Sequence, residues 1–333
     1  MDAAGATDGG TGVCLLYMGG PETLDQVEPF LLALFADRDL IRLPGGRLVQ
    51  GPLGRFIARK RAPKVRDRYA QIGGGSPLRR ITERQAELLG QALAPHGAFR
   101  VVVGMRYSAP RTAQALEELA AAGVSKVIAL PLYPHFSSAT TGSSFKDLDR
   151  ALAARGGSDG WRVERVQGFY DHPRYVEALA GTVQRGLEEL GGEAAVVFSA
   201  HSLPRELVEK RGDPYRDQVE ATVAAVVERL DLPRWELGYQ SRSGPVRWLE
   251  PDVLELVARH GEARTPALLV VPVSFVSDHI ETLHEIDIEM RAFALARGVG
   301  RFARAPSLNE DPTFIQALTE VVLETCQTID RSS

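Results

Sequence analysis

Short apolar strands alternate with amphipathic helices along most of this chain, and this alternation limits the possible folds more than any single motif does. Apolar, β-branched stretches typical of strands lie at residues 13–18, 101–105, 127–132, 163–169, 196–198 and 268–275, and a loop is predicted after residues 235–239. Amphipathic stretches typical of helices lie at residues 80–94, 112–122, 173–190 and 312–326. Such alternation predicts parallel sheets flanked by helices, an α/β fold. In these sheets, ligand sites lie beyond the carboxyl ends of the strands.

The size and composition of the chain narrow its class. Its 333 residues, 44% of them hydrophobic and 25% charged, suggest two domains that can each bury a core. The net charge of −4 disfavours a general nucleic-acid binder. No apolar run reaches the roughly 18 residues of a membrane span, and the start of the chain does not resemble a signal peptide. Residues 1–12 are small and polar and are predicted to be disordered.

The cysteine content points to the compartment. Cys14 and Cys326 are the two cysteines of the chain, which leaves no basis for a disulfide framework. We therefore expect a reducing compartment, the cytoplasm. Two cysteines are also too few for an iron–sulfur or zinc site with four cysteine ligands.

Residues 268–290 hold the densest group of ionisable side chains. Glu281, Glu285 and Glu289 are spaced four residues apart, so on the predicted α-helix they form one slowly drifting row. Other acids and histidines stand nearby in the sequence: Asp278, His279, His284 and Asp287. The row has no basic neighbour in the sequence before Arg291. Two interpretations remain open, a solvated helix face or a path for protons or a metal ion.

A histidine follows another predicted strand. Residues 196–198 are apolar, and Ser199-Ala200-His201-Ser202 comes directly after them. A histidine at a strand end is either a hydrogen-bonded structural residue or a ligand. If this strand and the one before Glu281 belong to one sheet, their carboxyl ends meet in one crevice. The imidazole and the carboxylate could then bind a metal ion or move protons near neutral pH.

Residues 29–68 differ in character from the rest of the chain, because they mix apolar side chains with an excess of arginine and lysine and contain repeated glycines and prolines. They fit a solvated basic helix, an apolar and basic lip for a large flat ligand with carboxylates, or contact with an anionic membrane. Met18 and Trp248 are each either core residues or the lining of a flat ligand. The glycines at 73–75 do not form a phosphate loop, since no Gly-Lys-Ser/Thr follows them.

Several motifs follow one another along the chain. They are Met18-Gly-Gly-Pro-Glu-Thr, Asp37-Arg-Asp-Leu, Gly73-Gly-Gly-Ser-Pro, Arg106-Tyr107, Thr140-Thr-Gly-Ser-Ser, Ser199-Ala-His-Ser-Leu-Pro, Gln240-Ser-Arg-Ser-Gly-Pro and Ser277-Asp-His-Ile-Glu-Thr-Leu. In content and order they resemble the ferrochelatases, which insert ferrous iron into a porphyrin. The resemblance covers nearly all of residues 13–318. Each motif is weak by itself, but those that contain Thr140, His201 and Glu281 are highly specific together.

The resemblance implies a chelatase-like fold and a role for each matching residue. Two similar Rossmann-like domains, residues 13–172 and 173–331, would enclose a porphyrin cleft, with the last helix packing back across its hinge. His201 and Glu281 would face the porphyrin nitrogens and the metal, and Glu285 and Glu289 would continue a proton or metal path. The other implied roles are lining the macrocycle (Met18, Trp248, Phe275), holding propionates (Arg61, Tyr69, Ser76), forming the other wall (Arg106, Tyr107) and flanking the central pair (Asp278, His279).

The resemblance also suggests the substrates. Many ferrochelatases hold an iron–sulfur cluster, but Ser138 stands where some of them place a cysteine, so neither a cluster nor another cofactor is predicted. The first loop, Met18-Gly-Gly-Pro, resembles the protoporphyrin branch more than the coproporphyrin branch. The implied reaction inserts Fe²⁺ into protoporphyrin IX and releases two protons without ATP. A chelatase for coproporphyrin or sirohydrochlorin and a non-catalytic porphyrin carrier remain alternatives, as does peripheral membrane contact through residues 29–68.

Overall fold

The computed structural model describes residues 9–331 except for 39, 42, 44, 45, 159, 243 and 245. Two sheets of four strands form its centre, and every strand pair within them is parallel. The first has the order β2-β1-β3-β4, from β1 (Thr11–Tyr17), β2 (Phe99–Met105), β3 (Lys126–Pro131) and β4 (Arg162–Arg165). The second has the order β6-β5-β7-β8, from β5 (Ala195–His201), β6 (Trp235–Gln240), β7 (Ala267–Pro272) and β8 (Arg301–Arg304). The predicted α/β fold with two similar sheets is confirmed.

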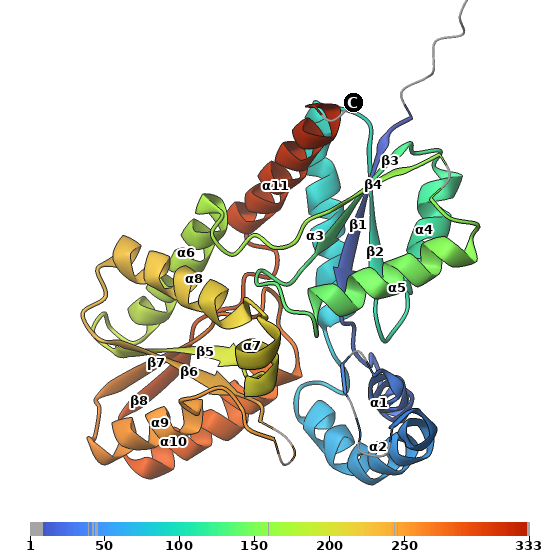
Figure 1. Cartoon of the computed structure of the whole chain (residues 1–333). Coiled ribbons are helices and arrows are strands. Elements are labelled where there is room, and N and C mark those ends of the chain that lie inside the picture. Colours follow the sequence, from blue (N-terminus) through green and yellow to red (C-terminus); the bar gives the residue numbers. More distant parts are fainter. Residues whose placement is uncertain are drawn as a thin grey trace, which may run out of the picture.

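Helices cover both faces of each sheet (Figure 1). Around the first sheet lie α3 (Leu78–Leu93), α4 (Thr112–Ala121) and α5 (Thr141–Ala154). Around the second lie α6 (Pro173–Glu189), α7 (Arg205–Arg211), α8 (Tyr215–Leu230), α9 (Val253–Glu262) and α10 (Arg291–Arg297). The last helix, α11 (Pro312–Arg331), packs against both α3 and α6 and so bridges the two sheets. The domain boundary near residues 172–173 stays a prediction.

The first strand shows why both faces of a sheet need cover. Val13, Leu15 and Tyr17 point into one apolar cluster, and Cys14 and Leu16 point into another. Successive side chains of a strand alternate between faces, so a strand that is apolar throughout must be buried on both sides. The cluster that contains Val13 continues into α6, α8 and α11 without a break. Apolar packing therefore joins the two halves of the molecule.

The ends of some strands differ from the sequence prediction. β1 begins at Thr11 instead of residue 13, because Thr11 and Gly12 already pair with β2 and β3. Residues 1–8 of the segment predicted to be disordered lie outside the described residues. The strand predicted at 268–275 ends at Pro272, since the chain turns away from the sheet there. β8 was not predicted, because it has four residues and an arginine at each end.

The segment predicted as a lip forms two helices, α1 (Val27–Ala36) and α2 (Gly46–Gln71), which we call the lip helices. In Figure 1 they stand together below the first sheet. Their own apolar cluster includes Phe35, Ala58 and Tyr69. Pro52 and Pro63 lie inside α2 without ending it, although prolines usually break a helix. We attribute this continuity to the packing of α2 along α1, which offsets the hydrogen bonds lost at the prolines.

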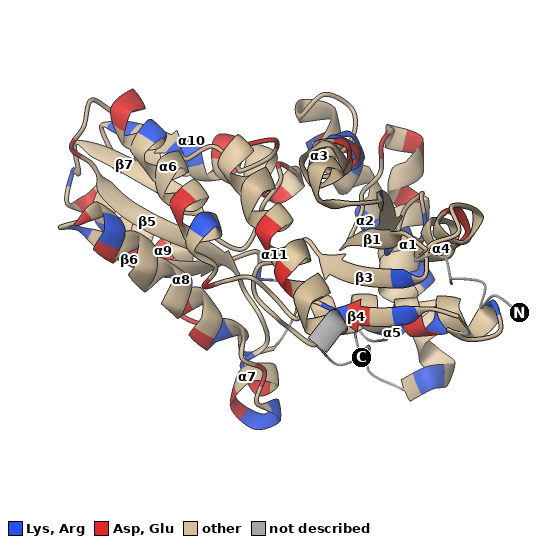
Figure 2. Ribbon diagram, turned by 90° about the horizontal axis from the view of Figure 1, so that it is seen from above, with Lys and Arg blue, Asp and Glu red and all other residues tan. Residues whose placement is uncertain are grey.

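Charge is distributed over the whole molecule. Figure 2 shows acidic and basic residues interspersed on both halves, which agrees with the small net charge of −4. Among the described residues, no helix is both long enough and apolar enough to cross a membrane.

Candidate active site

His201 and Glu281 come together although 80 residues separate them in the chain. His201 is the last residue of β5, and β7, the neighbour of β5, leads through a short loop to Glu281. The imidazole Nδ1 lies 2.8 Å from Glu281 Oε2. Adjacent parallel strands place their carboxyl ends side by side, and the two side chains predicted from the sequence meet in this way. The His201 side chain is 35% exposed, so an external molecule can reach the pair.

The segment after Glu281 is a π-helix, η3 (Glu281–Met290), instead of the predicted α-helix. Its hydrogen bonds step five residues instead of four, and π-helical turns are rare and frequently lie at functional sites. A turn then takes more than four residues. Glu281, Glu285 and Glu289 therefore fall slightly short of a full turn at each step, whereas the predicted α-helix would overshoot it. The three carboxylates still form one row on the same side of the helix, which we call the acidic row.

Ser241 links the first two carboxylates of the acidic row. Its hydroxyl lies within hydrogen-bond distance of Oε2 of both Glu281 and Glu285. The hydroxyl has only one proton to donate. The two acids therefore compete for this one proton. Ser241 has a left-handed backbone, with φ of 65°, which holds the hydroxyl between the two acids.

The ionisation of the site follows from these contacts. Burial raises the pKa of Glu281, but the His201 charge and hydrogen bond, together with His279 and Ser241, outweigh burial and leave the pKa lowered. Burial and the charge of Glu281 raise the pKa of Glu285 well above its usual range. Glu285 therefore holds a proton more readily than Glu281 does.

The electrostatic effects on His201 oppose one another. Burial lowers its pKa, but the charge and hydrogen bond of Glu281 and the charge of Glu285 outweigh burial, so the pKa is raised. Its backbone is held as well, because the His201 N–H donates to Ser274 Oγ and Tyr215 donates its hydroxyl proton to the His201 carbonyl. Burial lowers the pKa of the neighbouring His279. The site thus contains one imidazole with a raised pKa, that of His201, and one with a lowered pKa, that of His279.

The outer end of the acidic row has a basic partner from a distant part of the chain. Arg68, on α2, lies 3.0 Å from Glu289 and 3.8 Å from Glu285. The sequence suggested no partner before Arg291, because a local pattern cannot show a contact across 221 residues. His284, which is buried, lies 3.7 Å from Glu289.

Two residues beside the central pair have different surroundings. The ring of His279 packs against Phe275, with centroids 4.2 Å apart, and Phe275 also faces the His201 ring at 6.1 Å. Asp278 pairs with Arg304 at 3.1 Å and accepts hydrogen bonds from Ser307, Asn309 and Thr282. These contacts tie the start of η3 to the loop after β8. Asp278 therefore anchors the helix, and its oxygens are occupied.

Arg106 and Tyr107 lie inside the protein. Arg106 forms ion pairs with Asp37 and Asp147, and all three side chains are mostly buried. Tyr107 donates its hydroxyl proton to the same Asp37, over 2.7 Å. We call these four residues the Arg106 cluster. The cluster joins the end of α1 to the end of β2 and to α5. Its polar atoms bind one another. Met18, which is half-buried, lies next to it and accepts a hydrogen bond from the Tyr107 N–H.

The other residues that the resemblance selected are spread around the same region. Arg61 is exposed and lies over the Phe35 ring. Tyr69 is buried, and burial together with the charge of Glu281 raises its pKa. Ser76 is also buried and accepts from the Leu78 N–H at the start of α3. Trp248 is half-buried, and its indole N–H has no partner among the described residues.

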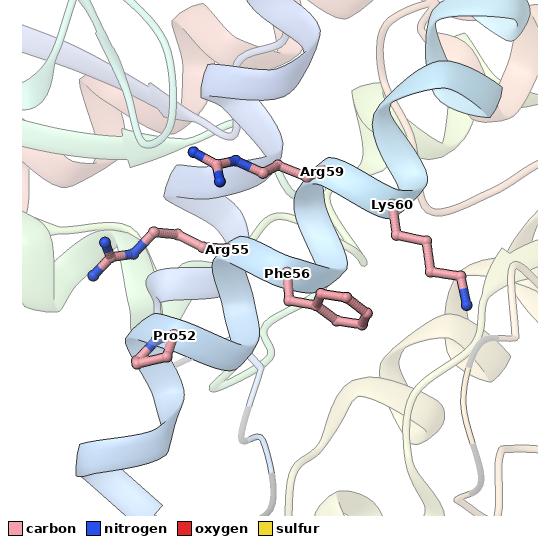
Figure 3. Close-up of a pocket in the computed structure, with 5 residues that line it drawn as sticks. All are labelled: Pro52, Arg55, Phe56, Arg59 and Lys60. Atoms are coloured by element: carbon pink, nitrogen blue, oxygen red, sulfur yellow. The ribbon is translucent and has the colours of Figure 1, made fainter.

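An open groove of about 580 Å³ lies on α2. Its lining consists of Pro52, Arg55, Phe56, Arg59 and Lys60 (Figure 3). All five residues are exposed and come from one helix, so this groove belongs to the outer surface of the lip helices. In the described part of the chain, no three histidine, cysteine or acidic side chains converge as a ready-made metal site.

Comparison with known proteins gives consistent matches. The family model described as Ferrochelatase matches residues 10–326. The ferrochelatase of Geotalea uraniireducens (strain Rf4) is 48% identical over 317 residues, which cover 95% of this chain and 98% of the relative. Ferrochelatase-2, chloroplastic, of Arabidopsis thaliana is 44% identical over 325 residues, or 95% of this chain and 64% of the relative.

A solved structure shares the fold. SirB from Bacillus subtilis with Fe³⁺ superposes with a TM-score of 0.56 at 10% identity, covering 95% of each chain. At that identity the likeness concerns the fold alone, and it agrees with the two parallel sheets described above.

Proposed function

Because the chain belongs to the ferrochelatase family, whose reaction is the insertion of iron into a porphyrin, we propose that it acts on protoporphyrin IX with His201 and Glu281 at the reacting centre. The family match over residues 10–326 supports the reaction class. The contact of 2.8 Å between His201 Nδ1 and Glu281 Oε2 is the observation that carries the proposed centre. Ferrous iron is a substrate in this reaction, and we propose that the enzyme uses no resident cofactor and no iron–sulfur cluster.

The proposed chemistry is proton removal beside a metal path. A porphyrin must lose two N–H protons when it gains Fe²⁺. His201 accepts a proton from the ring on its exposed side, while Glu281 stabilises the imidazolium that forms. The Ser241 hydroxyl then connects Glu281 to Glu285, and the acidic row leads on to Glu289. Each proton can leave by hydrogen-bond exchange along this row, or an iron ion can approach along it.

The remaining binding roles follow from exposure and position. We propose that Met18, Phe275 and Trp248, all half-buried, line the macrocycle. Arg61 is exposed on α2, and we propose that its N–H groups bind a propionate. Tyr69 and Ser76 are buried, and we propose that they support this wall. Arg106 and Tyr107 are engaged with Asp37, so we propose that they shape the wall without touching the porphyrin.

The lip helices fit a membrane surface. Leu48 is 93% exposed and Phe56 is 63% exposed, and three basic residues surround Phe56 in the groove. We propose that this surface meets an anionic membrane peripherally, on the cytoplasmic side, where an apolar porphyrin can be collected. Phe56→Asp should weaken co-sedimentation with vesicles that contain anionic lipid. Unchanged co-sedimentation, or none in the wild type, would contradict this part.

Activity is tested directly. The purified chain is mixed with protoporphyrin IX and ferrous iron in the absence of oxygen, and the haem spectrum is followed. Parallel reactions with coproporphyrin and iron, and with sirohydrochlorin and cobalt, compare the alternative substrates. Faster turnover of either alternative would replace the protoporphyrin proposal. Tight binding of porphyrin without any conversion would instead indicate a carrier.

A further inference from the structure

The last turn of α2 connects the lip helices to the acidic row. Ile280, which directly precedes η3, packs against the apolar cluster shared by α1 and α2. Arg68 extends from that turn to the carboxylates of Glu285 and Glu289. One apolar contact and one ionic contact therefore hold the π-helix of the second half against the lip helices of the first.

Arg68 holds Glu289 through one end of its fork. Nη2 lies 3.0 and 3.3 Å from the two Glu289 oxygens, and Nη1 lies 3.8 Å from Glu285 Oε1. The Arg68 side chain is 27% exposed and that of Glu289 is 46% exposed. Hydrogen bonds between ionised groups are stronger than neutral ones, but contact with water screens them. We therefore expect a contact of moderate strength that sets geometry more than stability.

The groups around Arg68 show what it does for the acidic row. Glu285 and Glu289 face it from η3, and His284 from the same helix lies 3.7 Å from Glu289. Arg68 holds the Glu289 carboxylate at 3.0 Å and lies 3.8 Å from Glu285, so one guanidinium keeps both side chains directed along the row. Without it, the exposed Glu289 would turn to water.

We propose that Arg68 is a positioning residue for iron insertion, which holds the outer part of the acidic row in line and makes that alignment depend on the lip helices. This inference rests on the proposed function, because it assumes that protons or iron travel along the row. It adds a residue from the first half of the molecule to a path formed otherwise by the second half. Arg68 acts through Glu285 and Glu289 and does not touch the porphyrin.

The test compares Arg68→Gln with Arg84→Gln. Arg84 pairs with Glu87 on the surface of α3, so its variant loses an arginine–glutamate pair away from the row. For Arg68→Gln, kcat/KM for ferrous iron should fall about fivefold, as expected for a partly exposed ion pair. Binding of protoporphyrin IX, followed by fluorescence quenching, should match the wild type, and so should both kinetic constants of Arg84→Gln. Arg68→Lys should recover part of the loss, because it restores the charge without the fork.

A double-mutant cycle with Glu289→Gln separates positioning from general damage. If the two residues act as a pair, the double variant should lose no more activity than either single variant. Additive losses would overturn the proposal, as would wild-type kcat/KM in Arg68→Gln. If Arg68→Gln does not fold, Arg68→Lys takes its place in the cycle, because it keeps the charge but loses the fork. A wild type that makes no haem would instead disprove the proposed function.

Discussion

Two groups of charged residues lie at carboxyl ends of strands, one in each half of the molecule, and they differ in what their polar atoms bind. In the Arg106 cluster, one guanidinium binds two carboxylates and a tyrosine hydroxyl binds one of them. In the site around His201, neighbouring acids share one serine proton, and the imidazole is 35% exposed. The first group has its bonding capacity filled from within, whereas the second keeps capacity for an incoming molecule.

This difference shows that position at a strand end does not by itself make a site. Both groups satisfy the rule that polar residues after parallel strands gather at one edge of the sheet. A buried charge that is fully paired contributes to the structure, and its removal exposes the cost of burying its partners. A partly exposed set of acids with raised and lowered pKa values can exchange protons. The two groups should therefore respond to substitution in opposite ways.

The largest effect is expected at the reacting centre. His201→Ala removes the proposed base, so kcat should fall about 100- to 10,000-fold, the range typical of general acid–base catalysis. Binding of protoporphyrin IX and the unfolding midpoint should change little. Steady-state haem formation, fluorescence quenching and thermal melting measure the three quantities. Turnover near the wild-type level would show that His201 is not the base, and the proposed difference between the His201 site and the Arg106 cluster would then be wrong.

The opposite response is expected at Arg106. Arg106→Met leaves Asp37 and Asp147 buried without their cation, so the free energy of unfolding should fall by about 3–5 kcal/mol. Denaturant unfolding measures this loss. Arg100→Gln, which breaks the exposed pair with Glu118, is the control and should stay within about 1 kcal/mol of wild type. Equal losses in the two variants would show that the Arg106 cluster is not a structural unit.

A smaller effect is expected at Ser241. Ser241→Ala removes the hydroxyl between Glu281 and Glu285, so protons must cross by another route and kcat should fall about tenfold, the equivalent of roughly 1.4 kcal/mol. Ser241→Thr keeps a hydroxyl and should recover part of the rate. The solvent isotope effect on kcat should change in the alanine variant if proton transfer through Ser241 limits turnover. Wild-type kcat in Ser241→Ala would show that the acidic row does not use this link.

The smallest effect concerns the protonation of His201. Its folded pKa is raised, so the protonated ring stabilises the folded state at low pH, and this contribution is lost as the pH rises through the folded pKa. Glu281→Gln removes the charge that outweighs burial, so the pKa should fall below the ordinary value of about 6.5. NMR titration of the imidazole measures both values. An unchanged pKa would mean that Glu281 does not control this ring.

Much of the fold could be predicted because it depends on local patterns. Apolar β-branched runs identified six of the strands, and their alternation with amphipathic stretches predicted parallel pairing. β8 was not predicted, because four residues with an arginine at each end show no strand pattern. The π-helix was not predicted either, because the same side chains are compatible with an α-helix and with a π-helix. Its form depends on hydrogen bonds with a step of five residues, which the residue pattern does not reveal.

The site was predictable only in part. His201 and Glu281 stood out because each follows an apolar strand. Ser241 lay within a motif that had been noticed, but its left-handed backbone and its place between two acids arise from the fold. Arg68 was one of many basic residues in its segment, and nothing local distinguished it from the others. The resemblance placed Arg106 in a ligand wall, and the sequence did not reveal its partners Asp37 and Asp147, because they are distant in the chain.

The amino-acid order alone determined the parallel sheets, the family, and the placement of an imidazole and a carboxylate at strand ends, because these follow from periodicity and from motifs read along the chain. Only the tertiary structure decided which charged groups are fully paired within the protein and which can still bind an incoming molecule. That decision depends on contacts such as Arg68 with Glu289 and Arg106 with Asp37. Electrostatic interactions depend on distance in space and on burial, and neither is written in the spacing of residues.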